Sequence, residues 1–178
     1  MIGASNLKTT LHGVLVNVAN IGVLITGESE TGKSACALEL LSIGHKLIAD
    51  DVVEITKIDD RLLGSAPERF AGLLEIRGLG IVDIRRLFSE SSFAEQSVID
   101  LKIEFGKTHS GESFDRLGSG TTKGEILGVM VPEFFYCIDG YVNARLFVET
   151  AVKLSKIQAA VVATDLALLT TQSFRKKF

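Results

Sequence analysis

Short runs of β-branched and other apolar residues, separated by turn residues, dominate the first part of the chain. Residues 12–18 (HGVLVNV) and 22–26 (GVLIT) are two such runs, and only Ala19, Asn20 and Ile21 lie between them. β-Branched residues favour strands, and a short connection with a polar residue is typical of a tight turn. The pattern therefore predicts two neighbouring strands joined by a turn.

The next apolar pattern has a helical period. In SACALELLSIG, which begins at Ser34, apolar residues recur three and four positions apart, and the run stops at Gly44, a favourable C-terminal cap. Residues 27–34 (GESETGKS) lie between the second strand and this helix. The predicted order is strand, glycine-containing loop, helix.

Further strands are predicted along the middle of the chain. They are KLIA (46–49), VVEIT (52–56), SVIDLKIEF (97–105) and ILGVMV (126–131). A mixed segment centred on LLEIRGLGIVDIRRLF (73–88) lies among them. Strands alternating with helical segments predict an α/β fold.

The C-terminal part predicts helices from about residue 141. The first covers 141–157, with Glu149 and Lys153 paired on its polar face. A terminal helix follows in AAVVATDLALLTTQ. Its apolar stripe, which is more typical of a core or a subunit contact than of a catalytic site, consists of Ala159, Val162, Ala163, Leu166 and Leu169. Because no repeat, low-complexity tract or clear linker interrupts the chain, we expect one domain over 1–178.

Composition excludes several classes of partner. Lysine and arginine total 19 and aspartate and glutamate 22, so the net charge of -3 predicts neither a nucleic-acid nor a membrane-surface partner. No apolar run approaches the roughly 20 residues that span a bilayer. Two cysteines without paired spacing argue against a disulfide scaffold and a zinc site, and favour the cytoplasm. The mean hydropathy of +0.30 hints at apolar surface buried between copies of the chain.

The segment GESETGKS matches the phosphate-binding pattern G-x-x-x-x-G-K-[ST]. Backbone N–H groups of such a loop surround a phosphate, the lysine adds a positive charge, and the hydroxyl binds Mg²⁺. Alternatively, the two glycines only allow a strand-to-helix turn. Because a strand and a helix flank the motif as required, nucleotide binding is favoured. The candidate nucleotide-binding residues are Gly27, Glu28, Ser29, Glu30, Thr31, Gly32, Lys33 and Ser34.

Glu28 and Glu30 are unexpected where a polyphosphate lies. Because the cradle consists of backbone groups, both side chains can point to solvent, although Glu30 is expected to weaken nucleotide affinity. Downstream, Asp50 and Asp51 end the strand that follows the loop helix, so they are expected at the edge of the sheet where the phosphates sit. One carboxylate suits Mg²⁺ held through water and the other suits a base; the alternative is an ordinary charged turn.

Five segments together carry a resemblance to a known family. LHGVLVNV, GESETGKS, GHKLIADDVVEI, LLEIRGLGIVDI and FDRLG, in this order and at these separations, resemble the catalytic domain of HPr kinase/phosphorylase from about His12 to Lys156. LEIRGLGI is far more diagnostic than the phosphate loop. The resemblance implies a P-loop kinase domain with a central mixed sheet flanked by helices. It also implies ATP, Mg²⁺, the phosphocarrier protein HPr as serine substrate, reversal by phosphorolysis, and a homo-oligomer, by family resemblance a hexamer.

The resemblance also implies roles for individual residues. Lys33 would contact the β- and γ-phosphates, while Ser34 and Glu75 would hold Mg²⁺. Asp51 would be the general base, and in reverse the acid. Without the resemblance, Glu75 would be read as a solvated carboxylate of a strand.

Two further active-site positions depend on the same resemblance. His12 alone would be read as a packed or surface imidazole, and Arg116 as a surface charge beside Asp115. The resemblance implies that both residues are catalytic, and that Arg116 stabilises charge on the transferring phosphoryl group.

The chain departs from the family pattern at two places within the resemblance. A third glycine is usual where Glu30 stands, and after Pro132 the segment PEFFYCIDGYVN has Tyr141 and Val142 where an arginine is expected. Loss of that cation predicts kinase activity with weak or absent phosphorolysis. The separate N-terminal domain of many relatives is also not expected, as in short forms of the family.

Two other functions stay open at this point. One is a P-loop kinase or NTPase that acts on a small metabolite. The other is a nucleotide-sensing module whose catalysis has decayed, although the presence of Lys33, Ser34, Asp51 and Glu75 argues against decay.

Overall fold

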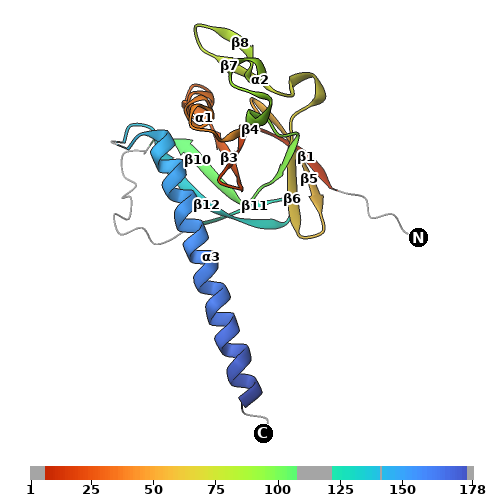
Figure 1. Cartoon of the computed structure of the whole chain (residues 1–178), viewed down its shortest axis with the longest axis vertical. Coiled ribbons are helices and arrows are strands. Elements are labelled where there is room, and N and C mark those ends of the chain that lie inside the picture. The colour runs from red at the N-terminus through yellow and green to blue at the C-terminus, as the bar shows by residue number, and fades with distance from the viewer. Residues whose placement is uncertain (1–6, 108–121, 141, 176–178) are drawn as a thin grey trace, which may run out of the picture.

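The structure is a computed structural model that describes residues 7–107, 122–140 and 142–175 of the 178-residue chain, with side chains described to residue 161. A six-stranded mixed sheet forms its centre, in the order β11-β12-β10-β3-β2-β4 (Figure 1). These strands are β11 (Thr122–Ile126), β12 (Val129–Cys137), β10 (Leu101–Gly106), β3 (Ile21–Gly27), β2 (Val14–Val18) and β4 (Lys46–Ala49). The mixed sheet confirms the predicted α/β class.

A second, antiparallel sheet packs beside the first. Its order is β1 (Lys8–His12), β5 (Val52–Ile58), β6 (Arg61–Ser65) and β9 (Gln96–Val98). The hairpin of β7 (Leu73–Ile76) and β8 (Gly80–Asp83) stands apart, at the top of Figure 1. The helices are α1 (Lys33–Ser42), α2 (Ile84–Leu87) and α3 (Ala144–Arg175), with short 3₁₀ turns at Glu68–Phe70 and Glu90–Ser92.

Strand direction brings two distant loops together. β2 is antiparallel to both β3 and β4, so β3 and β4 run in the same direction and end at the same edge of the sheet. The loop after β3 is the predicted phosphate loop, and Asp50 and Asp51 directly follow β4. This edge is therefore where a ligand-binding site is expected.

Alternating side chains of the central sheet bury two apolar cores. On one face, Val16 and Ile25 pack with Leu40 of α1 and Val148 of α3. On the other face, Leu15 and Leu24 pack with residues of the antiparallel sheet, such as Val53 and Ile55. The central sheet is thus covered by helices on one side and by a sheet on the other.

Three segments differ from the elements predicted for them. Residues 126–131 were expected to form one strand, but Leu127 and Gly128, with φ of 51° and 75°, form the turn between β11 and β12. Residues 97–105 form two strands in different sheets, because the chain passes from β9 to β10 at Ile99 and Asp100. The carboxylate of Asp100 accepts a 2.8 Å hydrogen bond from the backbone of Gly22 at this crossing.

A single helix, α3, replaces the two helices expected after residue 141. Asn143 caps its start, because its side-chain oxygen accepts a 3.1 Å hydrogen bond from the backbone N of Leu146. Neither glycine nor proline occurs within Ala144–Arg175, so nothing in the sequence ends a helix near 157. Glu149 pairs with Arg145 at 2.7 Å rather than with Lys153 as predicted.

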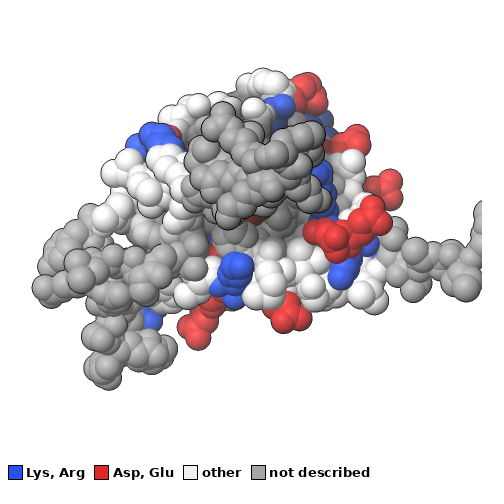
Figure 2. Space-filling view, turned by 90° about the horizontal axis from the view of Figure 1, so that it is seen from below, with Lys and Arg blue, Asp and Glu red and all other residues white. Residues whose placement is uncertain are grey.

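The helix α3 crosses the sheet with its first turns and continues beyond the body toward the C-terminus (Figure 1). The stripe predicted for the terminal helix begins at Ala159, which is exposed; its other members lie outside the described side chains. Among the described residues visible in Figure 2, basic and acidic side chains are interspersed, and neither sign forms a continuous field. In the part of the chain that the structure describes, no helix has both the length and the apolar character needed to cross a membrane.

Candidate active site

The phosphate loop joins the end of β3 to the start of α1 through unusual backbone conformations. Gly27, Glu30 and Gly32 have φ values of 132°, 68° and 90°, all in the region that favours glycine. At Gly27 a side chain is also excluded by space, because a Cβ there would lie 2.1 Å from the carbonyl oxygen of Phe105. The loop therefore needs its first glycine for both conformation and close packing against β10.

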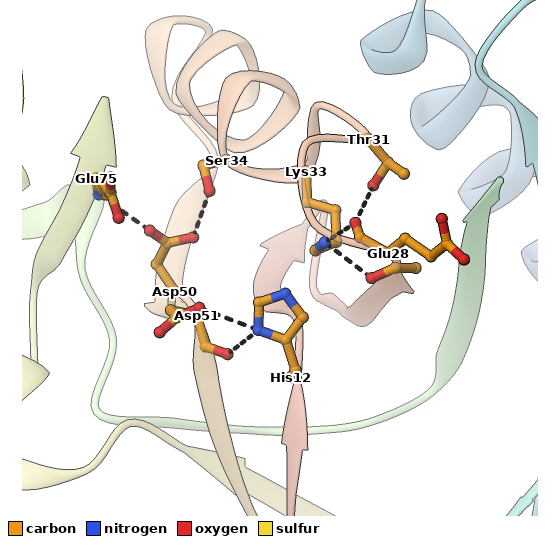
Figure 3. Close-up of polar contacts among 9 residues, drawn as sticks. His12, Glu28, Thr31, Lys33, Ser34, Asp50, Asp51 and Glu75 are labelled. Atoms are coloured by element: carbon orange, nitrogen blue, oxygen red, sulfur yellow. Dashed lines mark hydrogen bonds and ion pairs between the residues drawn. The ribbon is translucent and has the colours of Figure 1, made fainter. Parts of the chain in front are cut away.

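Lys33 begins α1 and turns its side chain back into the loop. Its Nζ donates hydrogen bonds to the carbonyl oxygens of Gly27, at 2.9 Å, and Glu28, at 2.7 Å (Figure 3). The residue is only 6% exposed, and burial lowers the pKa of Lys33, against the opposing charges of Asp50 and Asp51. The amine is thus a buried cation at the floor of the loop.

Asp50 links three elements at the same edge. Its Oδ1 accepts a 2.8 Å hydrogen bond from the hydroxyl of Ser34, and its Oδ2 accepts a 3.0 Å bond from the backbone N of Glu75 (Figure 3). Asp50 is 7% exposed, and burial raises the pKa of its carboxyl, although both hydrogen bonds act in the opposite direction. This carboxylate is enclosed by its partners and is poorly placed to meet a protein substrate.

Asp51 is the exposed member of the pair. Its φ of 68° turns the chain, and the backbone N of Gly13 donates to its carbonyl oxygen at 3.1 Å. His12 Nδ1 lies 3.0 Å from both the carbonyl oxygen and Oδ1 of Asp51 (Figure 3). Because both of these partners are acceptors, Nδ1 carries the hydrogen. The imidazole therefore holds the Asp51 carboxylate beside the loop.

Arg77 reaches the site from the β7–β8 hairpin. It follows β7 at the turn of the β7–β8 hairpin, and its Nη2 pairs with Oε1 of Glu30 in the phosphate loop. Glu28 behaves differently, because its carboxylate points away from Lys33 and the two aspartates (Figure 3). Both loop glutamates are exposed, as expected, and Glu30 is in addition engaged in this ion pair.

These side chains surround one pocket of about 430 Å³. Its lining residues are His12, Val14, Ser29, Glu30, Gly32, Lys33, Ser34, Ala35, Leu38, Asp50, Asp51, Glu75, Ile76 and Arg77. The phosphate loop, the end of β4, the end of β1 and the β7–β8 hairpin therefore converge on a single space.

The lining of the pocket contains oxygen donors of the kind that bind Mg²⁺. Within the described residues, no three His, Cys, Asp or Glu side chains form a ready-made metal cage. Mg²⁺ at phosphoryl-transfer sites needs only one or two protein ligands, because phosphate oxygens and water complete its shell. The Ser34 hydroxyl and the carboxylates of Asp50 and Glu75 supply oxygen donors at one wall. This donor set fits Mg²⁺ bound together with a polyphosphate.

Comparison with known proteins shows the family of this chain. The model of the HPr serine kinase C-terminal domain matches residues 5–172. The chain belongs to this family. The resemblance noted in the sequence is thereby confirmed, together with the P-loop kinase fold.

Individual relatives of the HPr serine kinase family agree with this assignment. The HPr kinase/phosphorylases of Clostridium botulinum (strain Eklund 17B / Type B) and Clostridium perfringens (strain SM101 / Type A) are 43% and 44% identical over 144 residues. Each alignment covers 81% of this chain and 47% of the relative. The chain thus spans about half the length of the curated relatives that it matches.

A solved structure shows the same fold. The Hpr(Ser) kinase/phosphatase from Coxiella burnetii superposes with a TM-score of 0.83 at 30% identity. The match covers 90% of this chain and 98% of that one. The fold of this chain is therefore shared with that Hpr(Ser) kinase/phosphatase.

Most residues predicted for the site do line the pocket, and their individual roles stay predictions. Gly27, Glu28 and Thr31 belong to the loop but do not line this pocket; Thr31 instead donates to the carbonyl oxygen of Glu28 at 2.9 Å. Arg116, together with Tyr141 of the altered loop, lies outside the described residues. The segment 132–137, which was read as part of that loop, is strand in β12.

Sequence reasoning missed two features of the site. The sequence predicts that one aspartate of the pair Asp50-Asp51 holds Mg²⁺ through water, but it does not predict that Asp50 contacts both Ser34 and Glu75. The local pattern KLIADD does not show which aspartate is enclosed, because Asp50 lies just beyond β4 and its contacts with Ser34 and Glu75 are tertiary. The pairing of Arg77 with Glu30, 47 residues away, had no signal in the local sequence.

Proposed function

We propose that this protein is an ATP-dependent serine kinase that phosphorylates the phosphocarrier protein HPr or a homologue. The observation that carries the proposal is that Lys33 of the phosphate loop and the exposed carboxylate of Asp51 line the same pocket. A phosphate-binding cation and an accessible base within one pocket are what transfer to a hydroxyl requires. Membership of the HPr serine kinase family supports the choice of a protein serine as the acceptor.

In the proposed reaction the serine oxygen forms a bond to the γ-phosphorus of ATP, and the bond between that phosphorus and the β,γ-bridging oxygen breaks. Asp51 accepts the serine proton, and His12 keeps its carboxylate facing the pocket. Lys33 and the loop N–H groups offset the negative charge on the β-phosphate of ADP. Ser34, Glu75 and Asp50 would hold Mg²⁺, which would supply further charge neutralisation when bound.

The reverse reaction is proposed to be weak. Phosphorolysis requires inorganic phosphate to bind beside the phosphoserine, and this sequence has Tyr141 and Val142 where the family pattern has an arginine. Incubating phosphorylated HPr with inorganic phosphate and Mg²⁺ tests this proposal. Slow or undetectable pyrophosphate formation is expected, and rapid formation contradicts it.

The kinase proposal is tested by mass spectrometry of a panel of purified HPr proteins after incubation with this protein, Mg²⁺ and ATP. A single phosphoserine is expected, which should disappear in HPr proteins whose target serine is replaced by alanine. Lys33→Ala should lose both ATP binding and transfer. ATP consumption only in the presence of a small metabolite would favour the metabolite kinase, and tight ATP binding without any transfer would favour the nucleotide-sensing module.

We also infer a homo-oligomer, with a hexamer as the family-based expectation. Leu154, Ile157 and Val161 are 45%, 59% and 54% exposed and recur at the spacing of one helix face on α3. Light scattering after size-exclusion chromatography tests the number of subunits. The cytoplasm is the proposed compartment, because neither of the two cysteines forms a disulfide.

A further inference from the structure

Glu30 and Arg77 form an ion pair in the lining of the pocket. Glu30 belongs to the phosphate loop and Arg77 to the turn of the β7–β8 hairpin, and both line the same space as Lys33. A guanidinium beside a phosphate loop is well suited to bind a phosphate group, because its planar N–H groups match two oxygens at once. Here that guanidinium already has a carboxylate partner.

The guanidinium of Arg77 is one of few positive groups around a largely acidic pocket, within the part of the chain that the structure describes. Among the described lining residues, the lysine and arginine side chains are those of Lys33 and Arg77. The acidic side chains in the same lining are Glu30, Asp50, Asp51 and Glu75. A polyphosphate that enters therefore meets an excess of negative groups, and each available cation affects its affinity.

The backbone of Glu30 indicates that this carboxylate is held at some conformational cost. Its φ of 68° lies in the left-handed region, which is unfavourable for a residue with a long side chain. The side chains of Arg77 and Glu30 are 80% and 69% exposed, so water competes with their pairing and the contact is easily exchanged. The pair is thus weak enough for a ligand to displace it.

We propose that Glu30 competes with the phosphates of ATP for the guanidinium of Arg77 and thereby lowers the affinity of the pocket for nucleotide. On binding, Arg77 exchanges the carboxylate of Glu30 for phosphate oxygens. Glu30 then acts as an affinity-setting residue and Arg77 as a phosphate-binding one. This inference rests on the proposed function only in taking ATP as the ligand; it does not depend on HPr.

Titration calorimetry with ATP and Mg²⁺ tests the competition in four proteins: wild type, Glu30→Gln, Arg77→Gln and the double variant. Glutamine keeps the length and the backbone conformation of Glu30 and removes its charge. An exposed ion pair contributes up to about a fivefold change in an equilibrium constant, so Glu30→Gln should tighten ATP binding about three- to fivefold. In the Arg77→Gln background, Glu30→Gln should increase ATP affinity by a smaller factor. In that background it removes only the direct repulsion between the Glu30 carboxylate and the phosphates.

Glu95→Gln is the charge control. Glu95 is exposed and does not line the pocket. Its replacement should change ATP affinity less than twofold, by the size expected for an exposed charge outside the site. A gain equal to that of Glu30→Gln would overturn the proposal, because it would reflect only the net charge of the protein.

Other outcomes also overturn the competition. Equal gains from Glu30→Gln with and without Arg77 would show that the two residues act independently. Weaker ATP binding by Glu30→Gln would show that Glu30 orients Arg77 for the phosphate. Either result leaves the kinase proposal intact, since ATP still binds. If none of the four proteins binds ATP, both the competition and the kinase proposal are wrong.

Discussion

The hydroxyl of Ser34 donates a hydrogen bond to the carboxylate of Asp50 at 2.8 Å, which joins the first turn of α1 to the end of β4. The other oxygen of Asp50 accepts from the backbone of Glu75 in β7. One buried carboxylate thus sets the relative positions of the phosphate loop, the acidic strand end and the hairpin. The proposed metal ligands Ser34 and Glu75 are held on either side of it before any ligand binds.

Ser34→Ala should weaken Mg²⁺-dependent nucleotide binding. The hydroxyl is lost as a metal ligand, and loss of a ligand or its support costs about 10- to 100-fold in metal affinity. ATP affinity measured by calorimetry should therefore fall in the presence of Mg²⁺ and change much less in its absence. Ser42→Ala, at the exposed C-terminal end of α1, is the control and should behave as wild type. Equal losses with and without Mg²⁺ would contradict a metal role for Ser34.

Asp51→Asn should separate binding from transfer. The amide keeps the shape of the side chain but is not a base, so the transfer rate should fall about 10²- to 10⁴-fold while ATP affinity stays near that of wild type. Rapid-quench measurement of phosphoserine formation on HPr, with calorimetry for ATP, gives both quantities. A variant that transfers at the wild-type rate would show that Asp51 is not the base.

Gly27→Ala should destabilise the protein much more than Gly32→Ala. At Gly27 a Cβ would lie 2.1 Å from the carbonyl oxygen of Phe105 and φ is 132°, so both clash and strain oppose it. We expect a loss of about 2–4 kcal/mol in the free energy of unfolding. At Gly32, where φ is 90° and nothing lies within 4 Å, backbone strain alone should cost about 1–2 kcal/mol. Urea denaturation measures both, and equal losses would show that packing against Phe105 is unimportant.

The strand, loop and helix around Lys33 could be predicted from sequence because local patterns determine them. β-Branched runs, a glycine-containing loop and a helical period follow one another without interruption. The same patterns failed at Leu127, where an apolar residue with φ of 51° forms a turn inside an apolar run. They also failed at Ile99 and Asp100, because a strand that changes sheets retains its alternating pattern.

The candidate site was predictable in part for the same reason. The phosphate loop is one contiguous motif, and Asp50 and Asp51 follow a recognisable strand. Which aspartate is enclosed depends on tertiary contacts with Ser34 and Glu75, which a local pattern does not contain. The partner of Glu30 depends on where the β7–β8 hairpin folds, so the pairing of Glu30 with Arg77 could not be predicted from the local sequence.

The hairpin that carries Glu75 and Arg77 is anchored by a second carboxylate, Asp83. Its Oδ1 caps α2 by accepting from the backbone N of Arg85 at 3.0 Å, and its two oxygens accept from Nε and Nη2 of Arg85, each at 2.9 Å. Arg85 also donates to the carbonyl oxygen of Ala71 at 3.3 Å, next to the start of β7. The base of the hairpin is therefore tied together through this ion pair.

Asp83→Asn should reveal the ion pair through the pH dependence of stability. The side-chain hydrogen bond from Arg85 holds the pKa of the Asp83 carboxyl below its ordinary value of 3.8. Because the pKa of Asp83 is lower in the folded state, the unfolded state binds more protons as the pH falls. The stabilisation by the Asp83–Arg85 ion pair is therefore complete above about pH 3.8 and is lost as the pH falls through the folded pKa. Asparagine still caps α2 but cannot pair with Arg85 as an anion. The urea midpoint of the variant should therefore lie below that of wild type at about pH 7, and the two should converge below about pH 3.8. Asp60→Asn, in the exposed turn between β5 and β6, is the control and should have the same urea midpoint as wild type at both pH values. If the difference in midpoint between Asp83→Asn and wild type were unchanged in acid, the charge of the Asp83 carboxylate would not contribute to stability.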